Sequence, residues 1–257
     1  MRPARVTAVL TTLLDGRAFA EKLGQGAPAV VALHGWARTR ADWTSTLEGY
    51  DALALDLPGF GATPAPEPGP GAAWGSPEYA DWLAAILEGL DRPVIVGHSF
   101  GGRVGVQLAA RRPELVRGVV LTGVPLYKPP ATGKPKLAYR LGRALHARGL
   151  VPESRMEALR QKYGSEDYRN ARGVMRDVLV KVVNEDYTEQ VAQIAAGPDL
   201  PVRMVWGEHD TAAPTWMPQR ALETLGDRAR LTVVPGSAHL LDAALVAALR
   251  SAIEELV

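Results

Sequence analysis

The sequence predicts an α/β protein in which helices flank a mostly parallel sheet. Short apolar runs alternate with helical patterns along most of the chain, as in folds built from successive strand–helix units. Several runs are apolar without alternation, which is typical of strands buried on both faces of a parallel sheet. The chain has 257 residues, 47% of them hydrophobic, so it can build a sizeable core in one domain or in a domain with an insertion.

The chain begins with a predicted hairpin. The apolar residues of Val6–Leu14 are interrupted by threonine, and Asp15-Gly16 is a turn signal between two strands. Arg2 and Arg5 precede this stretch, but a cleaved leader would have a cleaner apolar run and a small-residue cleavage site. No run is long enough to span a membrane. We therefore expect a hairpin and a cytoplasmic location.

The other elements follow in alternation. The predicted strands are Ala29–Leu33, Ala52–Leu55, Val94–Val96, Val116–Leu121, Val202–Trp206 and Leu231–Val234. The predicted helices are Arg40–Leu47, Glu78–Leu90, Phe100–Arg111, Trp216–Leu225 and Asp242–Leu256. Before the second helix, Ser76 is the predicted N-cap and Pro77 the first helical residue, followed by an acid that faces the helix dipole. Thr63–Gly75, rich in Pro, Gly and Ala, is a predicted loop.

One segment breaks the alternation. From about Tyr127 to Ala196, helix-forming stretches separated by Pro and Gly replace the strand signals, over a length too great for a simple crossover. Ligands of open α/β sheets bind at the carboxyl ends of the strands, so an insertion after the sixth strand would cover that site. We expect a core of residues 1–126 and 197–257 and a helical cap of residues 127–196.

The first part of this insertion is basic. A mobile lid that attracts anionic substrates or lipid surfaces would have such a pattern, and so would a solvated helix face packed over the core, which is the commoner case. The charged residues are Lys128, Lys134, Lys136, Arg140, Arg143 and Arg148, and Leu137, Leu141 and Leu145 form an apolar stripe beside them.

A predicted nucleophile lies between the strand at Val94–Val96 and the helix at Phe100. Ser99 has Gly97 two residues before it and Gly101 two residues after it, the G-x-S-x-G pattern of a nucleophile elbow. A side chain at either glycine would clash with the neighbouring strand or helix. The alternative is an ordinary glycine-rich turn, but the strand before and the helix after favour the elbow, with the Ser99 hydroxyl raised above the strand end.

A serine hydroxyl needs a base to take its proton. Among five histidines, His239 is the one in a loop at the carboxyl end of the last strand, the same rim that carries Ser99. His98 lies in the turn itself, and its side chain should point away from the hydroxyl. His239 is therefore the predicted base, against the alternative of a plain loop histidine.

The base in turn needs an acid that fixes its tautomer. Asp210 follows the predicted strand at 202–206 and is the best candidate, with Glu208 as its competitor. The other strand end that could supply the acid, Thr122–Pro125, has no carboxylate, which favours Asp210. The order Ser, Asp, His along the chain is also the order that accompanies an elbow of this kind in an α/β sheet.

Backbone N–H groups should stabilise the oxyanion of a tetrahedral intermediate. The Phe100 N–H lies at a helix N-terminus, where orphan donors and the dipole favour an anion. The second predicted donor is the N–H of Trp36, because Gly35 lets the main chain turn toward the serine. The side chains of Trp36 and Trp43 are expected to contribute packing only.

Taken together, the motifs resemble the α/β-hydrolase superfamily over nearly the whole chain. They are His34-Gly35-Trp36, Asp56–Gly61, Gly97–Gly102, Gly207-Glu208-His209-Asp210 with Pro214, and His239. The resemblance implies a mostly parallel eight-stranded sheet with a helical cap after strand 6. It also implies the capped group of carboxylesterases, small lipases, cofactor-free haloperoxidases and meta-cleavage-product C–C hydrolases. Ser99 excludes the members that use an aspartate nucleophile. One departure is Ser237-Ala238 before His239, where glycine is commoner.

The expected activity is hydrolysis of small carboxylic esters through an acyl-enzyme, with no metal or organic cofactor. The same residues would support C–C bond hydrolysis or perhydrolysis, and a small-molecule receptor could also retain them. A net charge of +1 gives no argument for nucleic acid or for stable membrane association. The absence of cysteine excludes disulfides, thiolate metal sites and a cysteine nucleophile.

Overall fold

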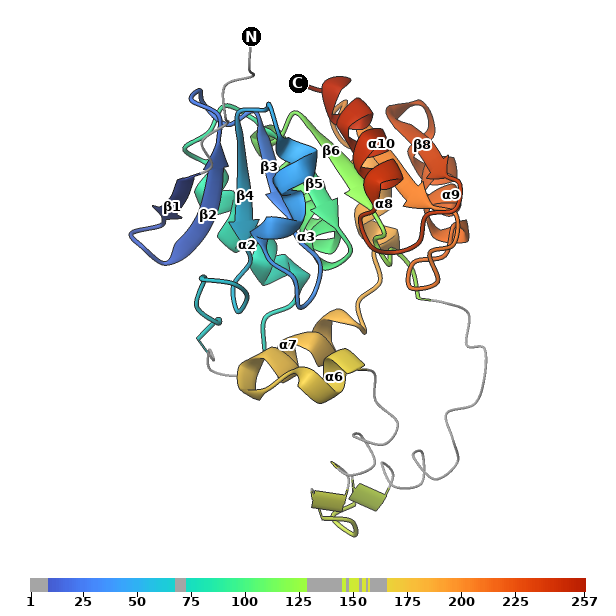
Figure 1. Cartoon of the computed structure of the whole chain (residues 1–257). Helices are drawn as coiled ribbons and strands as arrows, with labels where there is room; N and C mark the ends of the chain where they lie inside the picture. The colour runs from blue at the N-terminus through green and yellow to red at the C-terminus, as the bar shows by residue number, and fades with distance from the viewer. Residues whose placement is uncertain are drawn as a thin grey trace.

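The computed structural model describes residues 9–67, 73–128, 145–146, 148–152, 154–155, 157 and 166–257. Its centre is an eight-stranded sheet in the order β1-β2-β4-β3-β5-β6-β7-β8 (Figure 1). The strands are β1 (Val9–Leu13), β2 (Ala18–Leu23), β3 (Val30–Leu33), β4 (Ala52–Asp56), β5 (Val94–His98), β6 (Gly118–Thr122), β7 (Val202–Gly207) and β8 (Ala229–Val234).

Most of the sheet is parallel, as predicted. β1 pairs with β2, and β2 with β4, in antiparallel fashion, whereas β4, β3, β5, β6, β7 and β8 run in one direction. In the register, Leu33 of β3 lies opposite Gly97 of β5, and His98 lies opposite Thr122 of β6. The loops that leave these three strands therefore emerge side by side at the carboxyl edge.

Helices cover both faces of the sheet (Figure 1). α1 and α10 pack on one face, and α2, α3, α8 and α9 pack on the other. The helices are α1 (Thr44–Leu47), α2 (Ser76–Leu87), α3 (Phe100–Arg111), α6 (Glu166–Asn170), α7 (Gly173–Val182), α8 (Thr188–Ala196), α9 (Trp216–Leu225) and α10 (Ala243–Glu254). No helix in the described part of the chain is both long and apolar enough to cross a membrane.

The central strands explain the apolar runs of the sequence. Val31 and Leu33 of β3 join the core on the side of α2 and α3, while Val30 and Ala32 join the core on the side of α1 and α10. Because successive side chains of a strand point to opposite faces, a strand covered by helices on both faces is apolar at every position.

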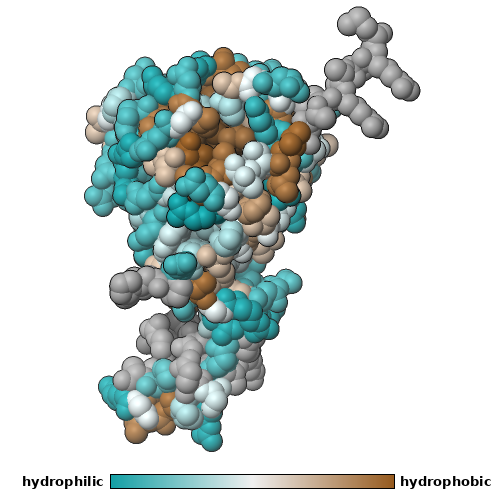
Figure 2. All heavy atoms as spheres, turned by 90° about the vertical axis from the view of Figure 1, so that its left-hand side faces the viewer, coloured by the Kyte–Doolittle hydropathy of each residue, from teal (hydrophilic) through white to brown (hydrophobic). Residues whose placement is uncertain are grey.

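The edge strand is different. On β1, Val9 and Leu10 are each 55% exposed, and apolar atoms gather on the side of the molecule that carries this edge (Figure 2). The predicted hairpin is present between β1 and β2, with Leu14 and Asp15 at positive φ in the turn. Residues 6–8 of the predicted first strand lie outside the described residues.

Two helix predictions were wrong in detail. Ser76 is already helical, and Gly75 is the N-cap, because the Glu78 carboxylate accepts a hydrogen bond from the Gly75 N–H at 2.6 Å. The Ser76 hydroxyl instead accepts from the Tyr187 hydroxyl at 2.9 Å. The predicted helix at 40–47 is a 3₁₀ turn, Arg40–Trp43, followed by the single α-turn of α1.

The described part of the insertion contains helices and no strand. α8, the last helix before residue 197, contacts α3 and α9, and its Val191 and Ile194 belong to the core beside the sheet. Among the helices described in this segment, α8 packs in the layer beside the sheet, and α7 reaches the same core through its buried Val178 and Val182. Lys134, Lys136, Leu137, Arg140, Leu141 and Arg143 lie outside the described residues.

Polar side chains join the end of α7 to the core. The Lys181 ammonium donates to the Ala73 carbonyl at 2.8 Å and pairs with Glu78 at 3.1 Å. The Arg103 guanidinium of α3, almost fully buried, donates to the Val182 carbonyl at 2.6 Å. With the bond from Tyr187 to Ser76, these contacts fix the chain where it returns from the insertion.

Candidate active site

The turn between β5 and α3 holds Ser99 in an unusual conformation. Its φ is +48° and its ψ −107°, a combination that non-glycine residues rarely adopt. The Ser99 N–H donates to the Thr122 carbonyl of β6 at 2.9 Å, and the Arg103 N–H donates to the Ser99 carbonyl at 3.1 Å. Main-chain bonds on both sides therefore maintain a strained residue whose side chain is half-buried at the edge of the sheet.

The two motif glycines are required by close main-chain contacts. A Cβ atom at Gly97 would lie 2.5 Å from the Gly102 Cα in the helix. A Cβ atom at Gly101 would overlap the Leu33 carbonyl of β3. These are the clashes with helix and strand that the sequence predicted.

The structure brings the three predicted catalytic side chains together. His239 Nε2 lies 3.2 Å from Ser99 Oγ, and His239 Nδ1 lies 2.9 Å from Asp210 Oδ2. Asp210 is 4% exposed, whereas the His239 ring is a quarter exposed. The chain of hydrogen bonds thus runs from a buried carboxylate to a hydroxyl at the surface of the site.

Main-chain donors fix the orientation of Asp210. Its Oδ1 accepts from the N–H groups of Ala212 and Ala213 at 2.9 and 2.8 Å, which leaves Oδ2 for the histidine. The competitor, Glu208, is exposed and accepts from the Gly236 N–H at 3.0 Å, away from the His239 ring. Asp210 is therefore the acid that contacts His239.

Gly123 contributes to the site in a way that the sequence interpretation missed. It follows β6 with a φ of +59°, and a Cβ atom there would lie 3.1 Å from the His239 ring and 3.2 Å from Asp210 Oδ2. Sequence reasoning noted only that this strand end lacks a carboxylate. The glycine in the sequence could have indicated this role, because a larger residue at position 123 would occupy the space of Asp210 and His239.

The loop that carries Trp36 is fixed by a buried histidine. The Leu57 N–H donates to His34 Nε2 at 3.0 Å, so the ring proton lies on Nδ1, which donates to the Gly35 carbonyl at 2.7 Å. Burial lowers the pKa of His34 and keeps its ring neutral. The Gly101 N–H donates to the His34 carbonyl at 3.0 Å and so joins this loop to the elbow.

Aromatic rings surround the two predicted oxyanion donors. The Trp36 ring packs edge-on against Phe60 at 4.9 Å and Phe100 at 5.4 Å between centroids, and Phe100 packs against Tyr79 at 4.9 Å. The side chain of Trp36 is thus a packing element, as expected. Phe100 is the first residue of α3, where backbone N–H groups have no partner within the helix.

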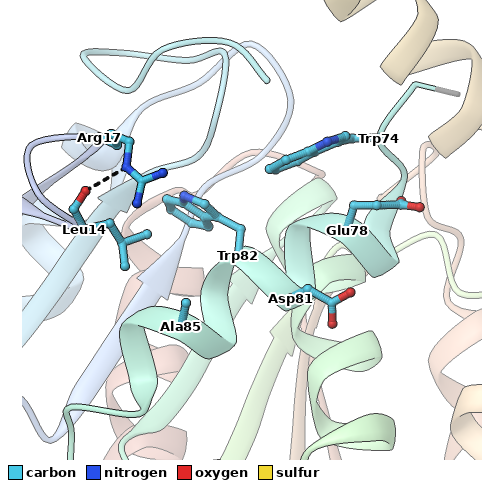
Figure 3. A pocket seen from close by; sticks show the side chains of 7 residues that line it. All are labelled: Leu14, Arg17, Trp74, Glu78, Asp81, Trp82 and Ala85. Carbon is cyan, nitrogen blue, oxygen red and sulfur yellow. Dashed lines mark hydrogen bonds between the residues drawn. The ribbon is translucent and has the colours of Figure 1, made fainter. Parts of the chain in front are cut away.

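A separate groove lies on the outer side of α2 (Figure 3). Its volume is about 430 Å³, and none of the residues lining it is Ser99, Asp210 or His239. The lining residues are Leu14, Arg17, Trp74, Glu78, Asp81, Trp82 and Ala85. Within the described residues, no group of three or more His, Asp and Glu side chains is placed to hold a metal ion.

A mostly parallel eight-stranded sheet with a serine in a strained strand–helix turn defines the class of α/β hydrolases. A model of the alpha/beta hydrolase family matches residues 30–249, and the chain belongs to this family. A solved thermophilic esterase superposes with a TM-score of 0.67 over 97% of this chain and 96% of its own, at 21% identity, which supports the fold alone.

Two curated relatives match shorter segments. The pimeloyl-acyl-carrier-protein methyl ester esterase of Shewanella woodyi is 38% identical over 104 residues, which are 39% of this chain and 37% of the relative. The 2-hydroxy-6-oxo-2,4-heptadienoate hydrolase of Pseudomonas putida is 36% identical over 110 residues, which are 39% of this chain and 38% of the relative. The chain thus spans less than two fifths of the length of either relative.

Proposed function

We propose that this hydrolase cleaves small carboxylic esters through an acyl-enzyme formed on Ser99. The observation that carries the proposal is the hydrogen-bonded series from Asp210 through His239 to Ser99, with distances of 2.9 and 3.2 Å, built on a serine at positive φ. An activated hydroxyl, a base and an orienting acid in this order are the requirements of acyl transfer by serine.

In the first half-reaction His239 Nε2 takes the proton of the Ser99 hydroxyl as the oxygen attacks the ester carbonyl. The imidazolium that forms is stabilised by Asp210, whose buried carboxylate is held by two main-chain N–H groups. His239 then protonates the leaving alcohol. Water, activated by the same histidine, attacks the acyl-enzyme and releases the acid.

Backbone donors would stabilise the negative charge on the carbonyl oxygen. We assign this role to the N–H groups of Phe100 and Trp36, one at the start of α3 and the other in the loop after β3. Two observations support this assignment. Phe100 lies at a helix N-terminus, and the hydrogen bond from the Gly101 N–H to the His34 carbonyl keeps the two loops adjacent. No step of this proposal uses a metal ion or an organic cofactor.

The insertion is proposed to cover this site. Met175 of α7 packs against Gly59 in the loop after β4, so α7 lies beside the carboxyl edge of the sheet. The cap in this proposal consists of the insertion up to the end of α7, while α8 belongs to the core.

The similarity to an acyl-carrier-protein methyl ester esterase favours an ester substrate. The similarity to a 2-hydroxy-6-oxo-2,4-heptadienoate hydrolase favours C–C bond hydrolysis as the second candidate. Both reactions suit the same three residues. They are separated by measuring kcat/KM for p-nitrophenyl esters from acetate to palmitate and for 2-hydroxy-6-oxo-2,4-heptadienoate.

The central test is Ser99→Ala. We expect ester turnover to fall about 10⁴–10⁶-fold without unfolding of the protein, and a fluorophosphonate probe to label wild-type Ser99 alone. Ser45→Ala, at an exposed serine of α1, is the control and should retain full activity. Persistent turnover in Ser99→Ala, or labelling of another serine, contradicts the proposal. A receptor would instead show saturable binding with very slow release of product.

A further inference from the structure

His98, the last residue of β5, is a buried histidine that the proposed reaction does not use. It immediately precedes Ser99 and is 2% exposed. Its Nε2 lies 2.9 Å from the main-chain carbonyl oxygen of His239. The two imidazole rings lie 4.9 Å apart between centroids.

The partners of His98 define its protonation. A carbonyl oxygen only accepts, so Nε2 must carry the proton and Nδ1 must be bare. Nδ1 is buried and has no hydrogen-bond partner in the described part of the chain. It faces Gly35, where a Cβ atom would lie 2.9 Å away. Burial, together with the neighbouring His239, lowers the pKa of His98 to about 4, so the ring is neutral at neutral pH.

A bare nitrogen in this position is unfavourable for stability. An unpartnered buried acceptor lowers stability, and a leucine or methionine of similar size would avoid that loss. Unlike leucine or methionine, histidine has an N–H donor on its other ring nitrogen. That donor reaches the main-chain carbonyl of His239 at 2.9 Å.

The main chain of His239 depends on that bond. On either side of it, the loop is held by other contacts: the His209 N–H donates to the Ser237 carbonyl at 2.8 Å, and the Ser237 hydroxyl donates to Asp242 at 3.1 Å. Among the described residues, no hydrogen bond other than that from His98 reaches the main chain of His239.

We propose that His98 is a positioning residue that holds the His239 main chain so that the imidazole stays within reach of Ser99. His98 and Ser99 are neighbours on one rigid turn, and both contact His239: one at its carbonyl, at 2.9 Å, and the other at its ring, at 3.2 Å. The distance from the base to the nucleophile is therefore set by adjacent residues of the elbow. The effect on turnover rests on the proposed function.

The test compares three variants by kcat and KM on a p-nitrophenyl ester, by the rate of fluorophosphonate labelling and by thermal unfolding. His98→Leu removes the donor at similar size, and His98→Asn keeps an amide that is too short to reach the carbonyl. His98→Gln places an amide N–H where Nε2 was. We expect kcat to fall about 10–100-fold in the Leu and Asn variants, with KM within about twofold of wild type.

The Gln variant should recover kcat to within about threefold of wild type, and labelling should follow kcat/KM in every variant. If the Leu variant fails to fold, the contrast between Asn and Gln provides the same comparison. Unchanged kcat in the Leu and Asn variants, or a Gln variant no better than these, overturns the proposal.

A substrate-free measurement separates this proposal from the proposed function. In ¹⁵N-histidine-labelled protein, the proton shared between His239 Nδ1 and Asp210 should be visible in the wild type and in His98→Gln, and lost by exchange in His98→Leu. If the wild type hydrolyses no ester and is not labelled, the proposed function fails, while the NMR contrast still decides the role of His98. An identical signal in all variants overturns that role.

Discussion

The elbow after β5 and the return of the insertion between α7 and α8 differ in the contacts that hold them. At the elbow, main-chain groups provide the contacts: the Ser99 N–H bonds the Thr122 carbonyl, and the Gly101 N–H bonds the His34 carbonyl. At the return, side chains provide most of them, as with Lys181 on Glu78 and Tyr187 on Ser76, and one main-chain bond runs from the Tyr187 N–H to the Leu126 carbonyl at 2.9 Å.

Because their contacts differ, the two regions should respond differently to substitution. Main-chain contacts with no room for a Cβ atom leave no adjustment, so a substitution at the elbow must strain the fold or move the reacting atoms. The partly exposed pair of Lys181 and Glu78 can be replaced by water at small cost, unlike the buried bond from Tyr187 to Ser76. We therefore expect substitutions at the elbow and its partners to act on kcat and stability, and substitution of the partly exposed Lys181 at the return to act weakly and on KM.

The largest effect is expected at the acid. Asp210→Asn should lower kcat about 10³–10⁴-fold, because an amide cannot stabilise the imidazolium and selects the wrong histidine tautomer. Glu208→Gln is the matched control two residues away, and we expect its kcat to stay within about threefold of wild type. Steady-state kinetics on one ester decides the matter, and equal losses in both variants would show that the acid is shared or misassigned.

The next effect concerns the main-chain contact between α3 and β3. Gly101→Ala places a methyl group against the Leu33 carbonyl, and we expect the free energy of unfolding to fall by about 3 kcal/mol. The control is Gly105→Ala on the same helix, where a Cβ atom would meet Ile95 at an ordinary 3.5 Å. That variant should be neutral or up to about 1 kcal/mol more stable in urea denaturation. Equal stability of Gly101→Ala and Gly105→Ala would contradict the conclusion that the contact between the elbow and β3 leaves no room for a Cβ atom.

A pH effect of similar size is expected from His98. Its pKa is about 4 in the fold, below the usual value near 6.5 in the unfolded chain. The unfolded chain therefore binds the proton first, so the stability is fully present above pH 6.5 and is lost as the pH falls toward 4.

Between pH 7 and 4.5, this group alone should remove about 2–3 kcal/mol of unfolding free energy. His34, whose pKa is also lowered by burial, acts in the same direction. Urea denaturation of His98→Gln at both pH values isolates the His98 contribution, because this variant should lose less stability on acidification than the wild type. Equal losses of unfolding free energy in the wild type and in His98→Gln would contradict the conclusion that the buried His98 ring is neutral.

The smallest effect is expected at the return of the insertion. Lys181→Met removes the bonds to Ala73 and Glu78, both contacts at partly exposed groups, so stability should change by less than about 1 kcal/mol. We expect KM to rise about threefold with kcat nearly unchanged. Asp81→Asn breaks the exposed pair with Arg111 on the outside of the core and should alter neither constant. A large loss of kcat in Lys181→Met would show that the return of the insertion controls turnover as strongly as the elbow does, which contradicts the comparison.

The sequence predicted the elbow well because its determinants are local. Gly97, Ser99 and Gly101 are within five residues of one another, and the strand–turn–helix pattern around them is legible from periodicity. Asp210 and His239 were also accessible, since parallel strands bring their carboxyl ends to one edge. In the structure, His239 Nδ1 lies 2.9 Å from Asp210 Oδ2.

Contacts between distant residues could not be predicted. His98 bonds a residue 141 positions away, and the Ser76 hydroxyl is taken by Tyr187, 111 positions away. For Ser76, this tertiary contact and the nearby Glu78 overrode its propensity to cap the helix. For α8, the helical period was visible, but nothing local showed that its apolar face packs against α3 and α9 rather than over the site.

The groove on the outer side of α2 also has an optical consequence. Trp74 packs edge-on against Tyr79 at 5.4 Å between centroids, and the ammonium group of Lys181 bonds the carbonyl of the preceding residue, Ala73, at 2.8 Å. Any displacement of α7 therefore changes the polarity and the quenching around this half-buried indole. Since the chain contains six tryptophans, the difference between the emission spectra of wild type and Trp74→Phe isolates its signal. The protein thus contains its own fluorescent reporter of movement between insertion and core, which needs no attached dye.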